Sequence, residues 1–591
     1  MNARTTLILA IVVALVGAFV WWDYKKGTPT DKRREQSRRL TNLKSDQVTR
    51  LELIFTNQTI VLEKKNNRWY LLEPIAYRAD SGTVNSMLDG LEFAEKKRTL
   101  SAEEVAGLDR NELGLVNPRL QVAWQTSTGR RVLRLGGETP TGDAFYAQFD
   151  GQPEVYIAEE YLFDRLNRTV NDLRDRTVLD FDPATTLRCE IKNGDRVLEF
   201  ARSGGDTASP WTIVRPVSAR ADQRAVSDLL SQLSRLRVQE FVSDNPADLA
   251  RYRLDEPARE ITISRSGVEG VLTLLVSTPD PQNAGRTYAK LKTADAILAL
   301  NTTDLPAAEL NVADYRDRRV LVFDENAVEG IEVLRGSERL VLTKTNADWQ
   351  VTAPAVQSAD RDRVQSLLGK LRDLRVDQFV TDVATELEPY GLATPAAVVR
   401  LQGSGTNIVA NLVISAPDAS RGLCLVKRDD EPFIYGITTN LPAWLPSHPL
   451  DVRPRRVASL SEASIRRFER QHGETREVIE RNEQGQWVLR EPVEGVLNTD
   501  DVTIVLNVFA ALDAEEFYRA APASLDQPTY RFVLLAGDQT YTLKLAGQDA
   551  SWSDPPLSFR LSEATVNTLI KPLVSTSASE TNAAPSSSAS P

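Results

Sequence analysis

WYLLEPIAYRAD at residues 69–80 is the first of four related stretches in this chain. The others are WTIVRPVSARAD at 211–222, WQVTAPAVQSAD at 349–360 and WVLREPVEGVLNTD at 487–500. Each has a tryptophan five residues before a proline, and the pairs are Trp69 and Pro74, Trp211 and Pro216, Trp349 and Pro354, and Trp487 and Pro492. The tryptophans are 142, 138 and 138 residues apart. Self-similarity at a nearly fixed period indicates one folding unit used repeatedly, so we expect four tandem modules.

An amphipathic helix is predicted after each proline. Its apolar residues recur at i, i+3, i+4 and i+7, which places them on one helix face that can dock on a sheet. These stripes are Val84, Met87, Leu88 and Leu91; Val226, Leu229, Leu230 and Leu233; Val364, Leu367, Leu368 and Leu371; and Val502, Val505, Leu506 and Phe509. Four residues before each stripe stands a predicted N-cap, whose side chain can accept hydrogen bonds from free N–H groups. The caps are Asp80, Asp222, Asp360 and Asn498.

Strands are predicted on both sides of this helix. Runs with period 2, such as Leu51, Leu53 and Phe55, precede the tryptophans. Others follow a third repeated mark, which reads LGLVNP at 113–118, YRLDEP at 252–257, YGLATP at 390–395 and SLDQP at 524–528. Each module is predicted to hold about three strands, a helix, a loop, about four strands and often a closing helix such as residues 161–173. Short connections favour antiparallel pairing, so the fold class is α+β with mainly antiparallel sheets.

The N-terminus carries a predicted membrane anchor. Residues 7–22 read LILAIVVALVGAFVWW, and with two preceding threonines they make about 18 residues, or about 27 Å of helix against a hydrocarbon core of about 30 Å. The segment ends in interfacial aromatic residues rather than a small-residue cleavage site, which favours an uncleaved signal-anchor. The basic residues that follow favour a cytoplasmic body by the positive-inside count, whereas long domains can translocate despite such charges.

The predicted organisation follows from these features and has seven parts. They are a transmembrane signal-anchor at 1–22, a basic juxtamembrane stalk at 23–40, α+β modules at 41–182, 183–324, 325–461 and 462–574, and a disordered Ser/Ala/Pro tail at 575–591. The tail has no large apolar residue with which to offset its ordering entropy.

A basic stretch ends the first three modules only. It reads LRDRTV at 173–178, YRDRRV at 315–320 and VRPRRV at 452–457. Since it occurs only where another module follows, one interpretation is a role at the joint between modules. The other, of equal weight, is a charged helix end that is favourable to the helix dipole.

Little in the composition points to catalysis. The net charge of −11, from 71 basic and 82 acidic residues, argues against nucleic-acid binding. Two cysteines and two histidines leave no Cys/His zinc cluster, and His448 and His472 are interpreted as surface or satisfied loop residues. The sequence carries none of the nucleotide, dinucleotide, hydrolase, metalloprotease or calcium-loop motifs. We therefore expect a non-enzymatic protein with no catalytic residue, metal, cofactor or small-molecule substrate.

The anchor followed by modules with W-x₄-P, an apolar helix and LGL-x₂-P resembles the bacterial family called domain of unknown function 4340. The resemblance spans about residues 41–574 and is best in the first copy, with NNRWYLLEPIAYRAD and NELGLVNP, while the fourth has SLDQP in place of LGL-x₂-P. It implies a membrane-anchored protein that is often encoded beside ABC-transporter parts like those of gliding-motility systems. The family brings no established activity or catalytic residues.

Two functions follow as hypotheses. The first is a single-pass protein of the bacterial inner membrane with a periplasmic body, serving as an accessory or scaffold of an ABC-type transport complex. The alternative is a cell-wall or polysaccharide-binding repeat protein that uses exposed tryptophans and basic joints. Residues present in all four copies are those that every copy needs, so Trp, Pro, cap and stripe are interpreted mainly as fold determinants, with the indoles buried.

Overall fold

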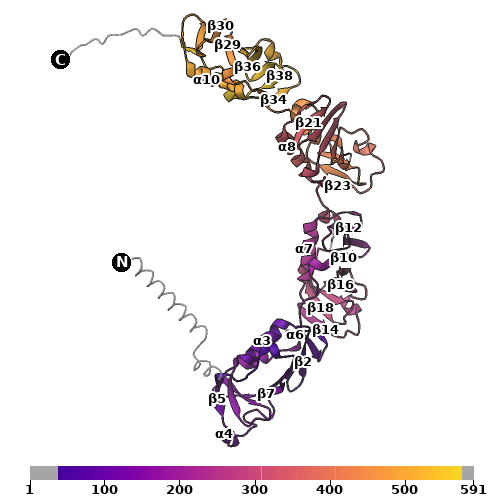
Figure 1. The fold of residues 1–591 in the computed structure, drawn as a ribbon. Helices are drawn as coiled ribbons and strands as arrows, with labels where there is room; N and C mark the ends of the chain where they lie inside the picture. The colour runs from indigo at the N-terminus through magenta and orange to yellow at the C-terminus, as the bar shows by residue number, and fades with distance from the viewer. Residues whose placement is uncertain (1–36, 308, 310, 406, 576–591) are drawn as a thin grey trace, which may run out of the picture. The chain divides into compact units, whose positions relative to one another are not determined.

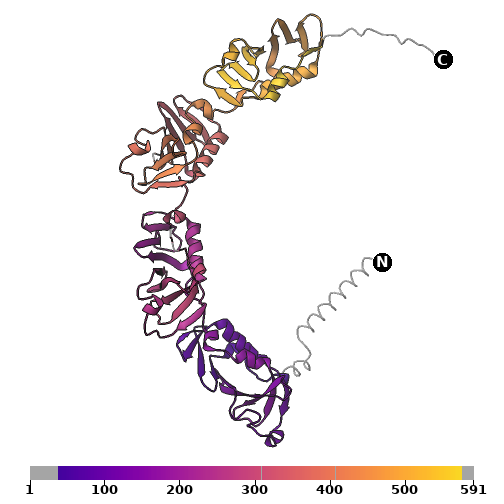
Figure 2. The same ribbon diagram turned by 180° about the vertical axis from the view of Figure 1, so that it is seen from behind.

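The computed structural model describes residues 37–307, 309, 311–405 and 407–575. The chain divides into two compact units between Asp317 and Arg318. Two modules lie in each unit, and each module has one principal sheet with a helix against one face (Figures 1 and 2).

The first unit holds modules 1 and 2. Module 1 consists of β1 (Arg50–Ile54), β2 (Thr59–Lys65), β3 (Arg68–Glu73), β4 (Tyr77–Arg78), α3 (Ser81–Glu92), β5 (Lys96–Leu100), α4 (Ala102–Ala106), β6 (Leu120–Thr126), β7 (Gly129–Glu138), β8 (Ala144–Phe149), β9 (Val155–Glu159), α5 (Tyr161–Leu166) and α6 (Val170–Leu173). Module 2 consists of β10 (Thr186–Asn193), β11 (Arg196–Arg202), β12 (Trp211–Arg215), β13 (Ala219–Arg220), α7 (Gln223–Ser234), β14 (Glu240–Ser243), β15 (Arg259–Arg265), β16 (Val271–Asp280), β17 (Asn283–Leu291) and β18 (Ile297–Asn301).

The second unit holds modules 3 and 4. Module 3 consists of β19 (Gly330–Arg335), β20 (Glu338–Thr345), β21 (Asp348–Ala353), β22 (Gln357–Ser358), α8 (Arg361–Arg372), β23 (Gln378–Thr381), β24 (Ala397–Gln402), β25 (Ile408–Asp418), β26 (Leu423–Arg428), β27 (Ile434–Ile437) and α9 (Leu441–Trp444). Module 4 consists of β28 (Arg456–Ala458), β29 (Ile465–His472), β30 (Thr475–Arg481), β31 (Trp487–Glu491), β32 (Val496–Leu497), α10 (Thr499–Val508), β33 (Leu512–Asp513), β34 (Glu516–Tyr518), β35 (Tyr530–Ala536), β36 (Gln539–Ala546), β37 (Asp549–Ser553), β38 (Pro556–Arg560), α11 (Glu563–Leu569) and β39 (Val574–Ser575).

One sheet topology is repeated in every module. The order is β4-β3-β2-β1-β6-β7-β8-β9-β5 in module 1, and modules 2 and 3 repeat it with their own nine strands. Module 4 has eight strands in the order β31-β30-β29-β35-β36-β37-β38-β34. Neighbouring strands run antiparallel, as in the β1–β6 and β5–β9 pairs. The prediction of repeated modules with mainly antiparallel sheets is therefore confirmed.

The strand count differs from the prediction in two places. A two-residue strand follows each repeated proline, and a further strand after the helix (β5, β14, β23 or β34) forms the far edge of the sheet. The two-residue strands are too short to show a period-2 pattern of apolar residues. The far-edge strands are too polar to show one, as in β5, which reads KKRTL. Residues 161–173 form α5 and α6 rather than the single closing helix predicted, because Thr169 caps a new helix by accepting a hydrogen bond from the Asp172 N–H.

The core of each module lies between the helix and the sheet. The whole α3 stripe joins Trp69, Leu51 and Leu120 in one cluster of module 1, and the stripes of α7 and α10 occupy the same place in modules 2 and 4. The α8 stripe is also buried. Burying a large apolar side chain contributes roughly 1.5–3 kcal/mol, so four such residues per helix explain why the stripe recurs.

The third repeated mark forms a buried turn on the opposite face of the sheet. Leu113 and Leu115 pack against Leu100 and Val155 there. The residue between the two leucines is left-handed, with φ +65° at Gly114. A Cβ at this glycine would lie 2.5 Å from the backbone nitrogen of Gly137, so this turn requires glycine.

The module boundaries lie several residues earlier than predicted. Val178 and Leu179 belong to the core of module 2, β28 pairs with β33 of module 4, and the two units part at 317/318 instead of 324/325. Leu40, predicted to belong to the stalk, is 5% exposed and packs in module 1, where its N–H bonds to the Ala94 carbonyl. Each module thus begins within the polar stretch before its first apolar strand, where hydropathy gives no signal.

Both ends of the prediction fall largely outside the described residues. The signal-anchor at 1–22, the stalk up to residue 36 and the tail from residue 576 all lie there. Within the described ranges no helix is long and apolar enough to span a membrane. Ser575, assigned to the tail, instead pairs with Val496 in the β32–β39 ladder.

Candidate functional site

The basic stretches at 173–178, 315–320 and 452–457 are here called the joint segments. Those at 173–178 and 452–457 each lie inside one compact unit and form backbone links between its two modules. In the first of them the Asp175 N–H bonds to the Arg78 carbonyl of module 1 at 3.0 Å. A few residues on, the Val178 N–H bonds to the Leu236 carbonyl of module 2 at 3.1 Å. Because both modules pair with one continuous segment, the joint has a defined geometry within the first unit.

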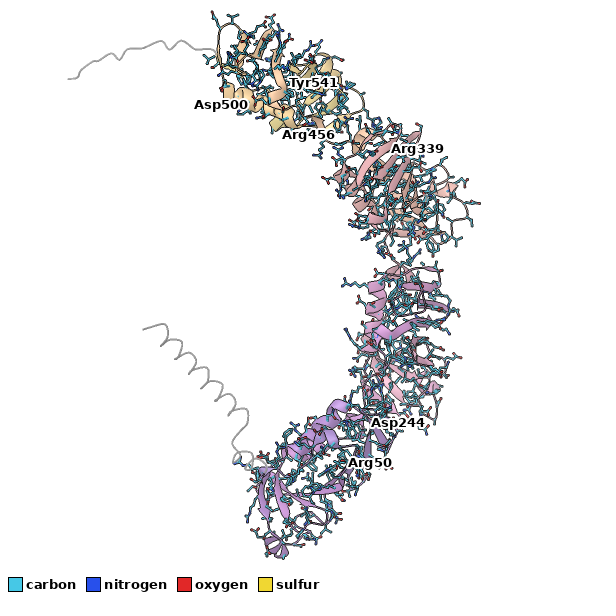
Figure 3. All side chains as sticks on the ribbon, viewed as in Figure 1. Arg50, Asp244, Arg339, Arg456, Asp500 and Tyr541 are labelled. Atoms are coloured by element: carbon cyan, nitrogen blue, oxygen red, sulfur yellow. The ribbon has the colours of Figure 1, made fainter. Side chains whose placement is uncertain are left out.

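Arg174 lies at the centre of this joint. Its side chain is 1% exposed, and its guanidinium carbon is 4.2 Å from the Tyr77 ring centre and 3.8 Å from that of Phe241. Its Nη2 atom is 2.7 Å from a carboxylate oxygen of Asp244, labelled in Figure 3. A cation held between two aromatic faces contributes up to about 2 kcal/mol per ring when desolvated, so this arginine couples Tyr77 of module 1 to Phe241 of module 2.

A second group of charges lies beside Arg174. Asp180 is 2.7 Å from both Arg68 and Arg78, and Arg78 also approaches Asp175 at 3.4 Å. Partial burial of Asp180 opposes ionisation, but the hydrogen bonds and positive charges of the two arginines outweigh it and lower the pKa of the carboxyl. The module junction therefore carries an ionised network of two arginines and Asp180.

The other joint segments repeat the backbone pattern within their own units. In the first unit the Asp317 N–H bonds to the Arg220 carbonyl, and in the second the Val320 N–H bonds to the Leu374 carbonyl. The third segment bonds on one side to Asp360 through the Val452 carbonyl, and on the other to Ala514 through the Arg455 carbonyl. The joint interpretation thus accounts for the basic stretches better than a helix end does.

The four predicted caps link the fold to the joints. Each accepts hydrogen bonds through its side chain from N–H groups in the first turn of its helix: Asp80, Asp222, Asp360 and Asn498. Each also donates its own backbone N–H to a carbonyl of the segment that closes its module: Leu173, Tyr315, Val452 and Leu573. The cap position therefore orients the helix and holds the segment that closes the module.

The repeated tryptophans lie in the cores. Trp69, Trp211 and Trp349 are 1%, 2% and 5% exposed, while Trp487 is half-buried and donates its indole N–H to Glu462. Three of the four therefore offer no open face to a sugar. The peptide bonds before Pro74, Pro216, Pro354 and Pro492 are all cis.

The aromatic half of the joint was not predicted from the sequence. Phe241, Phe379 and Phe517 each stand 30 residues after the module's tryptophan, whereas Thr99 occupies this position in module 1. The phenylalanine therefore occurs only in modules that have another module before them in the chain. The basic segment occurs only in modules that have another module after them. In the third joint Arg453 lies 5.8 Å from the Phe517 ring centre. The fixed offset of 30 is a signal that a comparison of the copies could have found.

The candidate residues for chemistry are dispersed. His448 caps a short turn by accepting from the Leu450 N–H, and His472 stacks on Tyr530 at 4.3 Å between ring centres. Cys189 and Cys424 are buried and unpaired thiols, and burial raises the pKa of Cys189 to about 12. Throughout the described ranges no three or more His, Cys, Asp or Glu side chains gather so that they could hold a metal ion.

These features define a class of protein built from tandem α+β modules with matched joints. A family model described as "Domain of unknown function (DUF4340)" matches residues 69–210, 211–350 and 349–528. The chain belongs to this family. The three matches begin at Trp69, Trp211 and Trp349, the residues that mark the first three modules.

Other comparisons add little. No curated protein matches the chain. A DNA polymerase sliding clamp from Pseudomonas aeruginosa, solved with a ligand, is 7% identical, with 65% of this chain and 94% of that chain covered and a TM-score of 0.11. A sliding clamp from Bacillus subtilis is 11% identical, with 66% and 93% covered and a TM-score of 0.09. At these TM-scores the likeness carries no argument.

Proposed function

We propose that this protein is a non-enzymatic scaffold, anchored in the bacterial inner membrane with its modules in the periplasm, and an accessory of an ABC-type transport complex. The observation that carries the scaffold part is the matched joint. The basic segment and the phenylalanine occur only at positions with a neighbouring module, so the copies are adapted to work as a series. Such a series presents several repeats of one surface to other proteins.

The membrane and transporter parts rest on different support. The apolar stretch at 7–22, together with the two preceding threonines, makes about 18 residues and is just long enough for a membrane span. The family resemblance implies a neighbourhood of ABC-transporter components. Periplasmic placement is the proposal's own choice against the positive-inside count, and it is supported by the ability of long domains to translocate despite flanking charge.

Crosslinking in intact cells tests the transporter part directly. Tagged full-length protein is crosslinked, extracted in mild detergent and analysed by mass spectrometry, with an uncrosslinked sample as the control. We expect ABC permease and ATPase subunits joined to specific module faces. Recovery of this protein without any transporter subunit would overturn that part of the proposal.

Protease accessibility tests the placement independently. In intact spheroplasts, added protease should digest the modules, because a periplasmic body is exposed once the outer layers are removed. A cytoplasmic marker protein in the same cells serves as the control for membrane integrity. Complete protection of the modules would place the body in the cytoplasm and contradict the proposal.

Polysaccharide binding remains the second candidate, but not through the repeated tryptophans. Three of these indoles are at most 5% exposed, so they lack the open ring face that stacking on a sugar requires. A glycan would need a different surface, and module 4 has one with suitable chemistry.

A further inference from the structure

The outer face of the module 4 sheet carries a continuous row of polar side chains. One residue from each of five neighbouring strands belongs to this row, and each is paired with the next. In order across the sheet they are Arg531 on β35, Lys544 on β36, Ser551 on β37, Ser558 on β38 and Tyr518 on β34. Residues paired in this way share one face of a sheet. Their chain neighbours on the other face, including Phe532, Leu543 and Phe559, lie in the core under α10, so the row faces away from the helix.

Two positive charges stand directly opposite each other in this row. Arg531 and Lys544 are both exposed, and within the described part of the chain neither side chain has an ion pair or hydrogen bond. Like charges at facing positions of an antiparallel pair are destabilising. A third cation, Arg519, lies at the same end of the module and is held by Glu338 at 2.8 Å and Asp451 at 3.2 Å.

These three cations line one cavity of about 650 Å³. The rest of its lining is rich in hydroxyl groups, and none of the described residues that line it is Asp or Glu. Behind the lining, Asp549 accepts a hydrogen bond from the Tyr518 hydroxyl at 2.8 Å. The hydroxyl side chains are Tyr518, Thr542, Ser551, Ser553 and Ser558. A volume of this size suits a small ligand or a short segment of a polymer. Two of the three cations, Arg531 and Lys544, have no carboxylate partner among the described residues, whereas Arg519 is neutralised by Glu338 and Asp451.

The paired cations occur in one module only. At the positions of Arg531 and Lys544, module 2 has Glu260 facing Leu275, and module 3 has Val398 facing Val413. In module 1 the facing residues are Gln121 and Arg134, and that arginine is paired with Asp150 at 2.6 Å. Since three copies of the same sheet form without two facing cations, the pair in module 4 is not a requirement of the fold.

We propose that this face of module 4 binds an anionic glycan, a saccharide chain that carries carboxylate groups. Arg531 and Lys544 would form charge-assisted hydrogen bonds with the carboxylates, and these bonds are about twice as strong as neutral ones. The serine and threonine hydroxyls both donate and accept, which matches sugar hydroxyls, while the Tyr518 O–H already donates to Asp549. An acidic peptide shares the charge but not the dense hydroxyl groups, so the lining favours the glycan.

Titration calorimetry on the full-length protein in detergent tests the proposal, with the trimer of galacturonic acid as the probe. We expect Arg531→Gln and Lys544→Gln each to weaken binding by at least about tenfold, since each removes one charge-assisted contact. Arg466→Gln is the matched control, because Arg466 is an exposed, unpaired arginine on β29 of the same module and lies outside the cavity. It should bind the trimer like the unaltered protein.

The melting temperature of the same variants supplies an independent readout. Removing one of two facing like charges should leave the melting temperature unchanged or raise it, while affinity falls. A lower melting temperature in both variants would overturn the argument that the pair serves binding rather than folding. So would absence of trimer binding, equal binding by all variants, or equal affinity for neutral maltotriose or for an oligoglutamate peptide.

Discussion

Replacing Arg174 with methionine is expected to loosen the joint between modules 1 and 2. The buried guanidinium lies within 4.2 Å of the ring centres of Tyr77 and Phe241, and each desolvated cation–π contact contributes up to about 2 kcal/mol. The ion pair adds less than about 1 kcal/mol, because the Asp244 side chain is 45% exposed. Methionine refills part of the volume and recovers apolar packing, so we expect a net loss of about 2 kcal/mol in the free energy of opening the joint.

Native-state hydrogen exchange on the full chain measures this free energy at the joint itself. The amides of Val178 and Val238 bond to the carbonyls of Leu236 and Arg176, so they exchange only when the joint opens. A loss of about 2 kcal/mol corresponds to roughly 30-fold faster exchange. Arg224→Met is the control, because that side chain is 91% exposed on α7. Equal exchange rates in the two variants would refute the reasoning.

Three further predictions concern single side chains. Asp222→Ala removes the acceptor for two N–H groups at the start of α7. It should lower the free energy of unfolding of module 2 by about 1 kcal/mol, as measured by hydrogen exchange. Asp228→Ala, on the exposed face of α7, is the control and should change this free energy little. Burial alone would raise the pKa of Glu332, but hydrogen bonds from two arginines, one of them Arg339 (Figure 3), lower it. Its contribution to stability is therefore present above the unfolded pKa and lost as the pH falls through the folded pKa, so Glu332→Gln should flatten the fall in melting temperature on acidification. Cys189, with its pKa raised to about 12 by burial, should resist iodoacetamide at pH 8 until module 2 unfolds.

Repetition made much of this fold predictable from the sequence. An apolar stripe at i, i+3, i+4 and i+7 that follows an Asp or Asn cap predicts an amphipathic helix. Because the pattern occurs four times, chance does not explain it. The helix bounds followed: α3, α7 and α8 each begin one residue after the cap. The basic joint segments could be located for the same reason, although their pairing partners could not be named.

The features that were missed depend on contacts between distant residues. The edge strand β5 has only exposed or half-buried residues before Leu100, so no hydropathy period marks it, and its place is set by pairing with β9. The position of Arg174 between two rings depends on residues that lie 97 positions before it (Tyr77) and 67 positions after it (Phe241). The cationic row of module 4 depends on the strand register, which local pattern does not fix in polar strands.

The left-handed turn of the third repeated mark offers a last test. Glycine can be preferred there because of its positive φ or because another backbone segment lies close by, and the copies of the turn differ in the second cause. Gly391 has φ +64°, and a Cβ there would meet its nearest neighbour at an ordinary 3.7 Å, whereas the same atom at Gly114 would lie 2.5 Å from the Gly137 backbone. Gly391→Ala should therefore cost only the left-handed backbone penalty of about 1 kcal/mol, and Gly114→Ala should cost this plus the displacement of β7. Module 2 already tolerates the backbone penalty, since Arg253 adopts φ +54° and bonds to Thr278 and the Pro279 carbonyl. Hydrogen exchange within each module measures both costs, and equal losses at the two glycines would show that the close approach to β7 does not limit this turn.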